Sequence, residues 1–253
     1  MIDLHVHLLG HRDREANKKN IRAFLDAASS ENLKEIGFSD HDIYLDQFNL
    51  PLIRETAAEY PDLRVRIGLE VDYSPRAEET IRNTLTLFPF DFVIGSVHEA
   101  DGWLFDLPEE EFRHHGWDAD ELYRRYFAIV TRSVKSGLFT TVGHFDLIKI
   151  FGVRSKTDVL ILADEALTAM AEYGLVLEVN TAGKYKPVGE FYPEKRLLEE
   201  AKRRGIALTL GADAHFAQHV GRDLQEACRL LREIGVKTVV GFEGRERVRY
   251  SLD

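Results

Sequence analysis

The sequence predicts an α/β fold: a TIM-like barrel of seven parallel strands with helices between them. Two observations predict it. Short apolar runs alternate with amphipathic helical segments along the chain, and a length of 253 residues is typical of a single barrel. No linker, low-complexity stretch or shift in composition divides the chain, so we expect one domain over residues 1–253. A doubly wound open sheet is the structural alternative.

Seven apolar runs are the expected strands. They cover residues 2–7, 35–41, 65–72, 90–98, 139–146, 174–181 and 206–215. Helical patterns lie between them, for example over 157–174 and 222–235. In the second of these helices the apolar residues follow the i, i+3, i+4, i+7 spacing of a buried face, and Gly235 stands where a left-handed C-cap would end it. A further helix is expected to begin at Pro193 and to end at Gly205.

The composition is that of a globular protein with an acidic balance. A formal net charge of −10 argues against a nucleic-acid or anionic-membrane partner. The single cysteine, Cys228, cannot form an internal disulfide, which favours a reducing compartment. No apolar run reaches membrane-spanning length, and Asp3 argues against a signal peptide. We therefore expect a cytoplasmic protein that binds neither nucleic acid nor membrane.

Imidazoles and carboxylates recur where the expected strands end. His5 and His7 share one face of the first strand, because side chains alternate along a strand. Nine such side chains would meet at one edge of a parallel barrel, the edge where active sites are built. They are His5, His7, His11, His41, Glu70, His98, His144, Asp213 and His215. If these were unrelated core histidines, they would have to fall at the ends of six strands by coincidence. We therefore predict that these side chains are metal ligands.

The ligand types and their number indicate the kind of metal site. Imidazole and carboxylate ligands suit Zn, Mn, Fe or Co better than calcium. Nine ligands exceed what one ion can use, so two or three divalent ions are expected, and Glu70 could bridge two of them. Clustered ions suit hydrolysis of a phosphate monoester, with a metal-bridging hydroxide as the nucleophile.

Several motifs resemble those of one family of metal-dependent phosphoesterases. They are HVH, EIGFSDH, GLEVDY, GSVHEADGW, GHFDLIKIFG, EVNTAGKYKPVGEFYP and TLGADAH. Together they resemble the PHP superfamily (polymerase and histidinol phosphatase), and over almost the full length its PHP-type histidinol-phosphatases. The resemblance implies a distorted (β/α)7 barrel with a trinuclear metal site. It also implies a histidinol-phosphatase that releases inorganic phosphate from L-histidinol phosphate in histidine biosynthesis.

The resemblance also implies how the ligands are shared among three ions. The first ion would be held by His5, His7, Glu70 and Asp213, the second by Glu70, His98 and His144, and the third by His11, His41 and His215. Two departures affect this pattern. Only three residues separate His7 from His11, fewer than the family usually has, so Asp13 could replace His11 or the third site could be weaker. Relatives carry an arginine where this chain has Tyr185, so a neighbouring lysine could contact phosphate instead.

Further polar residues are candidates for substrate binding and proton transfer. The candidate phosphate-binding cations follow strand ends or open helices: Arg154, Lys149, Lys184, Lys186 and Arg222. Glu99 could receive a substrate's ammonium or imidazolium group. The departing alkoxide needs a proton, from Asp213, from His215 or from a third-site water. Glu178 and Asn180 face the barrel interior, where they either orient ligands or form a structural hydrogen-bond network.

Two other functions compete with this interpretation. A PHP-family enzyme acting on protein phosphotyrosine or on nucleotides would use the same metal ligands, although the acidic charge argues against a nuclease. A non-catalytic metal-binding protein would also use them, and its signature would be a closed site without exchangeable water.

Overall fold

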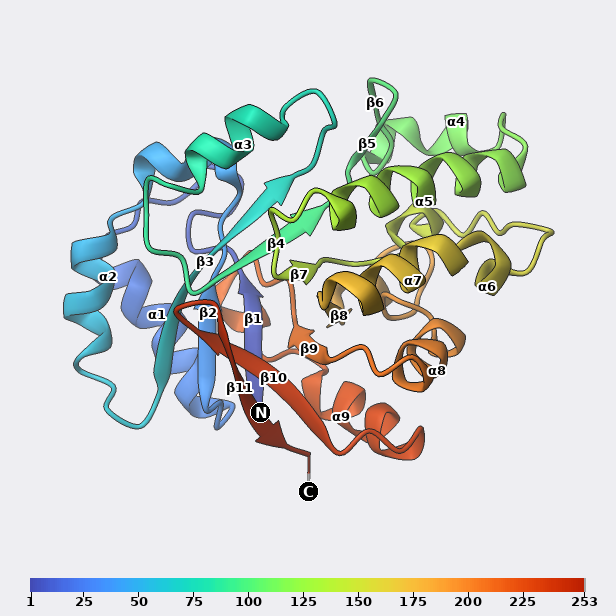
Figure 1. Ribbon diagram of the computed structural model, residues 1–253. Coiled ribbons are helices and arrows are strands. Elements are labelled where there is room, and N and C mark those ends of the chain that lie inside the picture. Colours follow the sequence, from blue (N-terminus) through green and yellow to red (C-terminus); the bar gives the residue numbers. More distant parts are fainter. Residues whose placement is uncertain (253) are drawn as a thin grey trace.

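Seven parallel strands form one sheet in the computed structural model, which describes residues 1–252 (Figure 1). In sheet order they are β1 (Ile2–Val6), β2 (Glu35–Phe38), β3 (Arg64–Asp72), β4 (Phe92–Ser96), β7 (Thr141–Val142), β8 (Val176–Asn180) and β9 (Leu208–Gly211). All neighbouring pairs in this sheet are parallel. Each of the seven expected strands is therefore present.

The first and last strands of the sheet meet and almost close a barrel. Val6 forms an isolated parallel bridge with Ala214. The His7 backbone N–H donates to the Ala214 carbonyl oxygen at 2.9 Å, and the Ala214 N–H donates to the His5 carbonyl oxygen at 3.0 Å. The prediction of a seven-stranded barrel, rather than an open sheet, is thus confirmed, and β7 is its shortest strand, with two residues.

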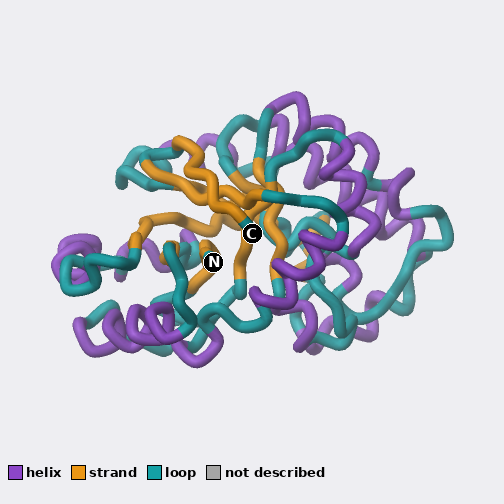
Figure 2. Tube along the Cα trace, turned by 90° about the horizontal axis from the view of Figure 1, so that it is seen from below, coloured by secondary structure: helices purple, strands orange, loops and turns teal. Residues whose placement is uncertain are grey.

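Nine α-helices within residues 1–252 surround the strands, as the view from below shows (Figure 2). They are α1 (Lys18–Ser30), α2 (Leu50–Ala57), α3 (Glu78–Thr84), α4 (Glu111–His114), α5 (Ala119–Lys135), α6 (Val159–Leu162), α7 (Asp164–Tyr173), α8 (Lys195–Arg203) and α9 (Leu224–Glu233). The helix predicted over 157–174 is divided at Ala163 into α6 and α7. No described helix is long and apolar enough to cross a membrane.

Short 3-10 helices follow several strands at their carboxyl ends. They are η1 (Asp42–Gln47), η2 (Pro108–Glu110), η3 (Leu147–Lys149), η4 (Ala182–Tyr185) and η5 (Ala217–His219). These turns and the loops around them carry most of the polar residues discussed below. They therefore form the rim of the carboxyl end of the barrel.

Two antiparallel hairpins were not expected from the sequence. The hairpin of β5 (Glu99–Ala100) and β6 (Trp103–Leu104) follows β4, and that of β10 (Thr238–Glu243) and β11 (Glu246–Ser251) ends the chain. The fully buried Glu35, at the amino end of β2, binds the C-terminal hairpin. Its carboxylate accepts hydrogen bonds from the Phe242 N–H at 3.1 Å and from the Tyr250 hydroxyl at 2.7 Å. This hairpin therefore covers the amino end of the barrel, opposite the predicted site.

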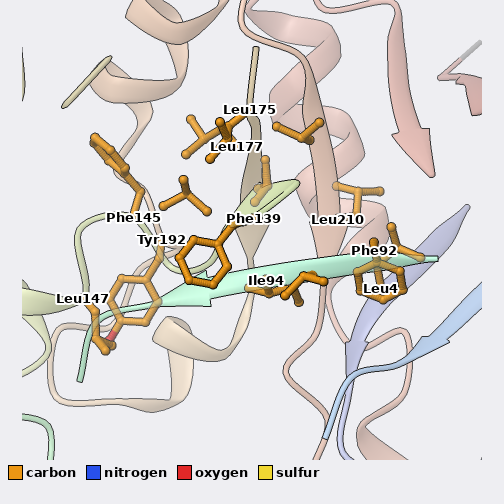
Figure 3. Close-up of a cluster of buried hydrophobic side chains, with 14 of the residues drawn as sticks. Leu4, Phe92, Ile94, Phe139, Phe145, Leu147, Leu175, Leu177, Tyr192 and Leu210 are labelled. Carbon is orange, nitrogen blue, oxygen red and sulfur yellow. The ribbon is translucent and has the colours of Figure 1, made fainter. Parts of the chain in front are cut away.

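Apolar side chains fill the barrel interior, with Phe92, Ile94, Phe139 and Leu210 among them (Figure 3). The ring of Phe92 occupies space that side chains on two neighbouring strands would otherwise fill. A Cβ atom at Gly68 of β3 would overlap this ring. Glycine in this strand is thus explained by close packing.

Replacing Gly68 with alanine should destabilise the protein. The added methyl group has to displace the buried Phe92 ring, and overpacking of this kind costs about 1–3 kcal/mol. Urea denaturation should show the lower free energy of unfolding. Gly116→Ala is the matched control, because a Cβ there meets its neighbours at ordinary contact distance. An unfolding midpoint equal to that of the unaltered chain would show that the core accommodates the methyl group.

Candidate metal centre

The first strand directs two imidazoles toward the carboxyl end of the barrel. His5 and His7 are two positions apart and share one face of β1, while Leu4 packs beside Phe92 in the apolar core (Figure 3); the register of β1 with β2 shifts between Asp3 and Val6. Both histidine side chains are fully buried, and their ring centroids lie 5.0 Å apart. The two histidines of the HVH motif are therefore neighbours, as the sequence predicts.

The Glu70 carboxylate on β3 lies at the middle of the cluster and is almost fully buried. Imidazole nitrogens from four other segments surround its two oxygens. Distances to Oε2 are 3.0 Å from His41 Nδ1, 3.4 Å from His5 Nε2 and 3.5 Å from His7 Nε2, and those to Oε1 are 3.0 Å from His144 Nε2 and 3.8 Å from His98 Nε2. The Glu70 carboxylate thus lies within 3.8 Å of imidazoles from four segments, an arrangement that suits the predicted bridging of two ions.

Three overlapping groups of side chains have the spacing of metal sites. They are His5, His7 and Glu70; Glu70, His98 and His144; and His7, His41 and His215. Within each group the potential ligand atoms lie within 4.8 Å of one another. The groups share Glu70 and His7, so they form one continuous centre.

Asp213 and His215 follow β9 and complete the open side of this centre. Asp213 Oδ1 lies 3.3 Å from His7 Nε2 and 3.9 Å from His5 Nε2. His215 stacks on His7 with ring centroids 4.1 Å apart, and its Nδ1 lies 3.4 Å from Asp213 Oδ1. The Asn180 side chain on β8 contacts Asp213 Oδ2 at 3.5 Å. Both residues therefore lie where the sequence placed them.

His11 lies at the edge of the centre. Its ring centroid is 4.3 Å from that of His215 and 5.9 Å from that of His41, but it belongs to none of the three groups. Asp13, the alternative ligand, accepts a hydrogen bond from the His11 N–H and pairs with Arg14 at 3.1 Å. In this arrangement His7 takes the place beside His41 and His215 that the resemblance gave to His11.

Several buried imidazole nitrogens have no hydrogen-bond partner. They are His5 Nε2, His7 Nδ1 and Nε2, His144 Nδ1 and His215 Nε2. A buried polar atom without a partner costs about 1–3 kcal/mol, so such a concentration needs a physical reason. Divalent cations held by these lone pairs would supply it. The donor set therefore fits metal ions of the kind the sequence predicted.

The charges within the centre also suit metal binding. Burial alone would raise the pKa of Glu70, but His5 and His41 outweigh it and hold the pKa well below its usual range. Burial would also raise the pKa of Asp213, but His5 and His7 outweigh it and hold that pKa well below its usual range. Burial, reinforced by His215 and His41, lowers the pKa of His7 well below its usual value. These are the metal-binding forms of the two carboxylates and of His7. Against the effect of burial, Glu178 and Glu70 raise the pKa of His5, and Glu70 raises that of His41, so metal binding would have to release protons from these two imidazoles.

A second layer of side chains holds the candidate ligands in place. Glu178 Oε1 accepts a hydrogen bond from His5 Nδ1 at 2.6 Å, and its Oε2 accepts one from the His144 backbone N–H at 2.7 Å. Of the two roles considered for Glu178, these contacts support the orientation of ligands. The sequence analysis missed two further residues of this layer. The Ser96 hydroxyl donates to Glu70 Oε1 at 2.7 Å, and Asp72 Oδ1 lies 3.4 Å from His98 Nδ1.

The candidate phosphate-binding cations are mostly neutralised. Arg154 pairs with Glu190 and, at 3.1 Å, with Glu194. Lys184 lies 2.9 Å from Asp223 and 2.7 Å from Glu226. The buried Lys149 lies 2.9 Å from Asp146 Oδ2 and 3.1 Å from Glu190, whereas Lys186 is exposed. The partners of Arg154 and Lys184 come from distant parts of the chain, so sequence spacing did not reveal them, whereas Asp146 is only three residues before Lys149.

Glu99, the candidate for an ammonium group, faces a cavity separate from the centre. It follows His98 directly and accepts a hydrogen bond from the Gly102 N–H at 3.0 Å. Its side chain lines a separate cavity of about 360 Å³ together with Arg76, Asp101 and Arg132. Glu99 is therefore next to a candidate ligand in the sequence, but its side chain faces a different cavity.

Comparison with known proteins agrees with this geometry. The family model of the PHP domain matches residues 3–182. A probable histidinol-phosphatase from Deinococcus radiodurans is 37% identical over 93% of this chain and 94% of its own length. The histidinol-phosphatase of Lactococcus lactis subsp. lactis is 27% identical over 96% of this chain and 94% of its own.

Two solved structures are similar over most of the chain. The crystal structure of the Lactococcus lactis histidinol phosphate phosphatase, complexed with Zn, L-histidinol and phosphate, superposes with a TM-score of 0.77 at 26% identity and covers 98% of both chains. A putative histidinol phosphatase from Listeria monocytogenes has the same fold, with a TM-score of 0.75 at 22% identity, and covers 90% of this chain and 100% of its own. By its matched domain and its full-length relatives, the chain belongs to the PHP domain family, on the branch of the histidinol-phosphatases.

Proposed function

We propose that this protein hydrolyses L-histidinol phosphate to L-histidinol and inorganic phosphate, using two or three divalent ions drawn from Zn, Mn, Fe and Co. The observation that carries the proposal is the set of three overlapping ligand groups joined by Glu70 and His7. The Lactococcus lactis relative, complexed with Zn, L-histidinol and phosphate, supports both the metal and the substrate.

The contacts support one assignment of ligands. We assign His5, His7, Glu70 and Asp213 to the first ion, Glu70, His98 and His144 to the second, and His41 and His215, with His7 beside them and His11 at the rim, to the third. Zn, Mn, Fe and Co all accept such imidazole and carboxylate sets. When bound, the ions would polarise the phosphate oxygens and lower the pKa of an attacking water.

The chain's own residues would position the substrate and handle the proton. Glu178 keeps the proton of His5 on Nδ1, so that Nε2 faces the centre. We assign transfer of a proton to the departing alkoxide to Asp213 or His215, because both border the open side; the ionised Asp213 would pass on a proton that it takes from the attacking water. Arg154, Lys184 and Lys186 are the proposed phosphate-side cations. Glu99 is the proposed partner of the substrate's ammonium group, for which its side chain would have to turn from its own cavity toward the centre. Arg154 and Lys184 would exchange a carboxylate partner for phosphate.

Phosphate release from a panel of substrates tests this proposal. The panel contains L-histidinol phosphate, a tyrosine phosphopeptide, nucleotides and an aryl phosphate, each with Mn, with Zn and with chelator. We expect fast turnover of L-histidinol phosphate that the chelator abolishes. Metal-dependent turnover confined to another substrate would overturn the substrate, and no turnover on any would revive the metal-binding protein. We place the reaction in the cytoplasm, where the free Cys228 stays reduced.

A further inference from the structure

Arg222 differs from the other candidate cations at the rim of the centre. Arg154, Lys149 and Lys184 are each paired with carboxylates. Within residues 1–252, by contrast, Arg222 forms no ion pair, and its buried Nε has no hydrogen-bond partner. A guanidinium group is always charged and presents five N–H donors. The Nε–H of Arg222 is therefore a buried donor that a ligand could satisfy.

The neighbours of Arg222 are arranged so that its charge stays unpaired. The guanidinium carbon lies 3.6 Å from the centroid of the Tyr185 ring. The Tyr185 hydroxyl donates to Asp223 Oδ2 at 2.6 Å, and Lys184 binds Asp223 Oδ1 at 2.9 Å. Both oxygens of the adjacent carboxylate are therefore occupied by other donors. The planar guanidinium rests on an aromatic face, which leaves its N–H edge available to a ligand.

The backbone of Arg222 is anchored next to the candidate metal ligands. The Thr181 hydroxyl donates to the Arg222 carbonyl oxygen at 2.7 Å, and the Gly221 N–H donates to the buried Asp3 Oδ2 at 2.8 Å. Thr181 directly follows Asn180, whose side chain contacts Asp213. Arg222 also lies on the same β9–α9 loop as Asp213 and His215. Its position relative to the centre is thus held from two sides.

We propose that Arg222 binds the phosphate group of a phosphate monoester at the rim of the metal centre, with Tyr185 as its positioning residue. The inference rests on the proposed function, since it assigns a residue to the phosphate of that same substrate. A planar fork can hold two phosphate oxygens at once, which the lysines of this rim cannot do. Arg222 would contact phosphate without taking part in bond cleavage.

Two measurements on metal-loaded protein test the role of Arg222. Calorimetric titration with inorganic phosphate gives Kd, and steady-state kinetics with L-histidinol phosphate give KM and kcat. We expect Arg222→Ala to raise Kd and KM about tenfold to a hundredfold, as for the loss of charged hydrogen bonds. The change in kcat should be smaller, because the contact exists before and during the reaction. Arg222→Lys should recover part of the loss, and Tyr185→Leu should give an intermediate one.

Arg82→Ala, which changes an exposed arginine on α3, is the matched control and should leave both constants unchanged. Elemental analysis should show the same metal content in all variants, and circular dichroism the same fold. Wild-type Kd and KM in Arg222→Ala would overturn the inference, as would an equal loss in Arg82→Ala. If the unaltered protein fails to turn over L-histidinol phosphate but its phosphate affinity still depends on Arg222, the proposed substrate is wrong and the role of Arg222 stands.

Discussion

Replacing Glu70 with glutamine should abolish the hydrolysis of L-histidinol phosphate. An amide has one acceptor oxygen and no charge, whereas the carboxylate contacts imidazoles on both of its oxygens. Loss of a shared metal ligand would remove several kcal/mol of transition-state stabilisation, so kcat should fall on the order of a thousandfold. Elemental analysis should show fewer bound ions, and phosphate release should show the lost activity.

A matched control separates this effect from a general loss of charge. Glu79→Gln changes an exposed glutamate on α3 and should leave metal content and kcat unaltered. Full metal content and full activity in Glu70→Gln would rule out Glu70 as the shared ligand. Loss of activity with full metal content would restrict its role to the chemical step.

Glu178→Gln is expected to have the second largest effect, through the orientation of two candidate ligands. The carboxylate accepts hydrogen bonds from His5 Nδ1 and from the His144 backbone N–H on separate oxygens. A glutamine can serve only one of these donors and would turn its NH₂ group toward the other. Loss of such a supporting contact typically reduces metal affinity by about 10–100-fold.

Competition with a chelator measures this change in metal affinity for Glu178→Gln. Glu172→Gln, on the exposed face of α7, is the control and should bind metal like the unaltered chain. Addition of excess metal should rescue much of the activity of Glu178→Gln, since its ligands remain present. A variant with normal metal affinity but reduced activity would show that Glu178 acts on the substrate instead.

The strand pattern and the strand-end histidines were predictable because both follow from local sequence. His5 and His7 lie on one face of β1 through simple alternation, and the parallel order brings His41, His98 and His144 to the same edge. These features need no knowledge of which strands are neighbours.

Contacts across strands could not be predicted in the same way. Asp72 and Ser96 support the ligands His98 and Glu70, and they are register partners on β3 and β4. Register is set by the packing of the whole sheet, which one sequence does not display. The ion pairs that occupy Arg154 and Lys184 depend on loop conformations for the same reason.

The C-terminal hairpin was missed although it carries a local signal. Arg247, Val248, Arg249 and Tyr250 alternate between polar and apolar or aromatic residues, and Gly244 with Arg245 forms a turn with positive φ at both positions. Alternation around such a glycine is a hairpin signal. The hairpin lies beyond the last expected helix, over 222–235, and forms a separate sheet, so the barrel pattern does not predict it.

The closure of the barrel between β1 and β9 determines when the molecule can be completed during its synthesis. The strand at residues 2–6 leaves the ribosome well before its partner around Ala214, which is made more than two hundred residues later. Until then the histidines of β1 stand beside an open edge, without Asp213 or His215. The full ligand set therefore exists only after residues 213–215 have been made. Folding through so distant a contact is intrinsically slow, and metal loading must follow it.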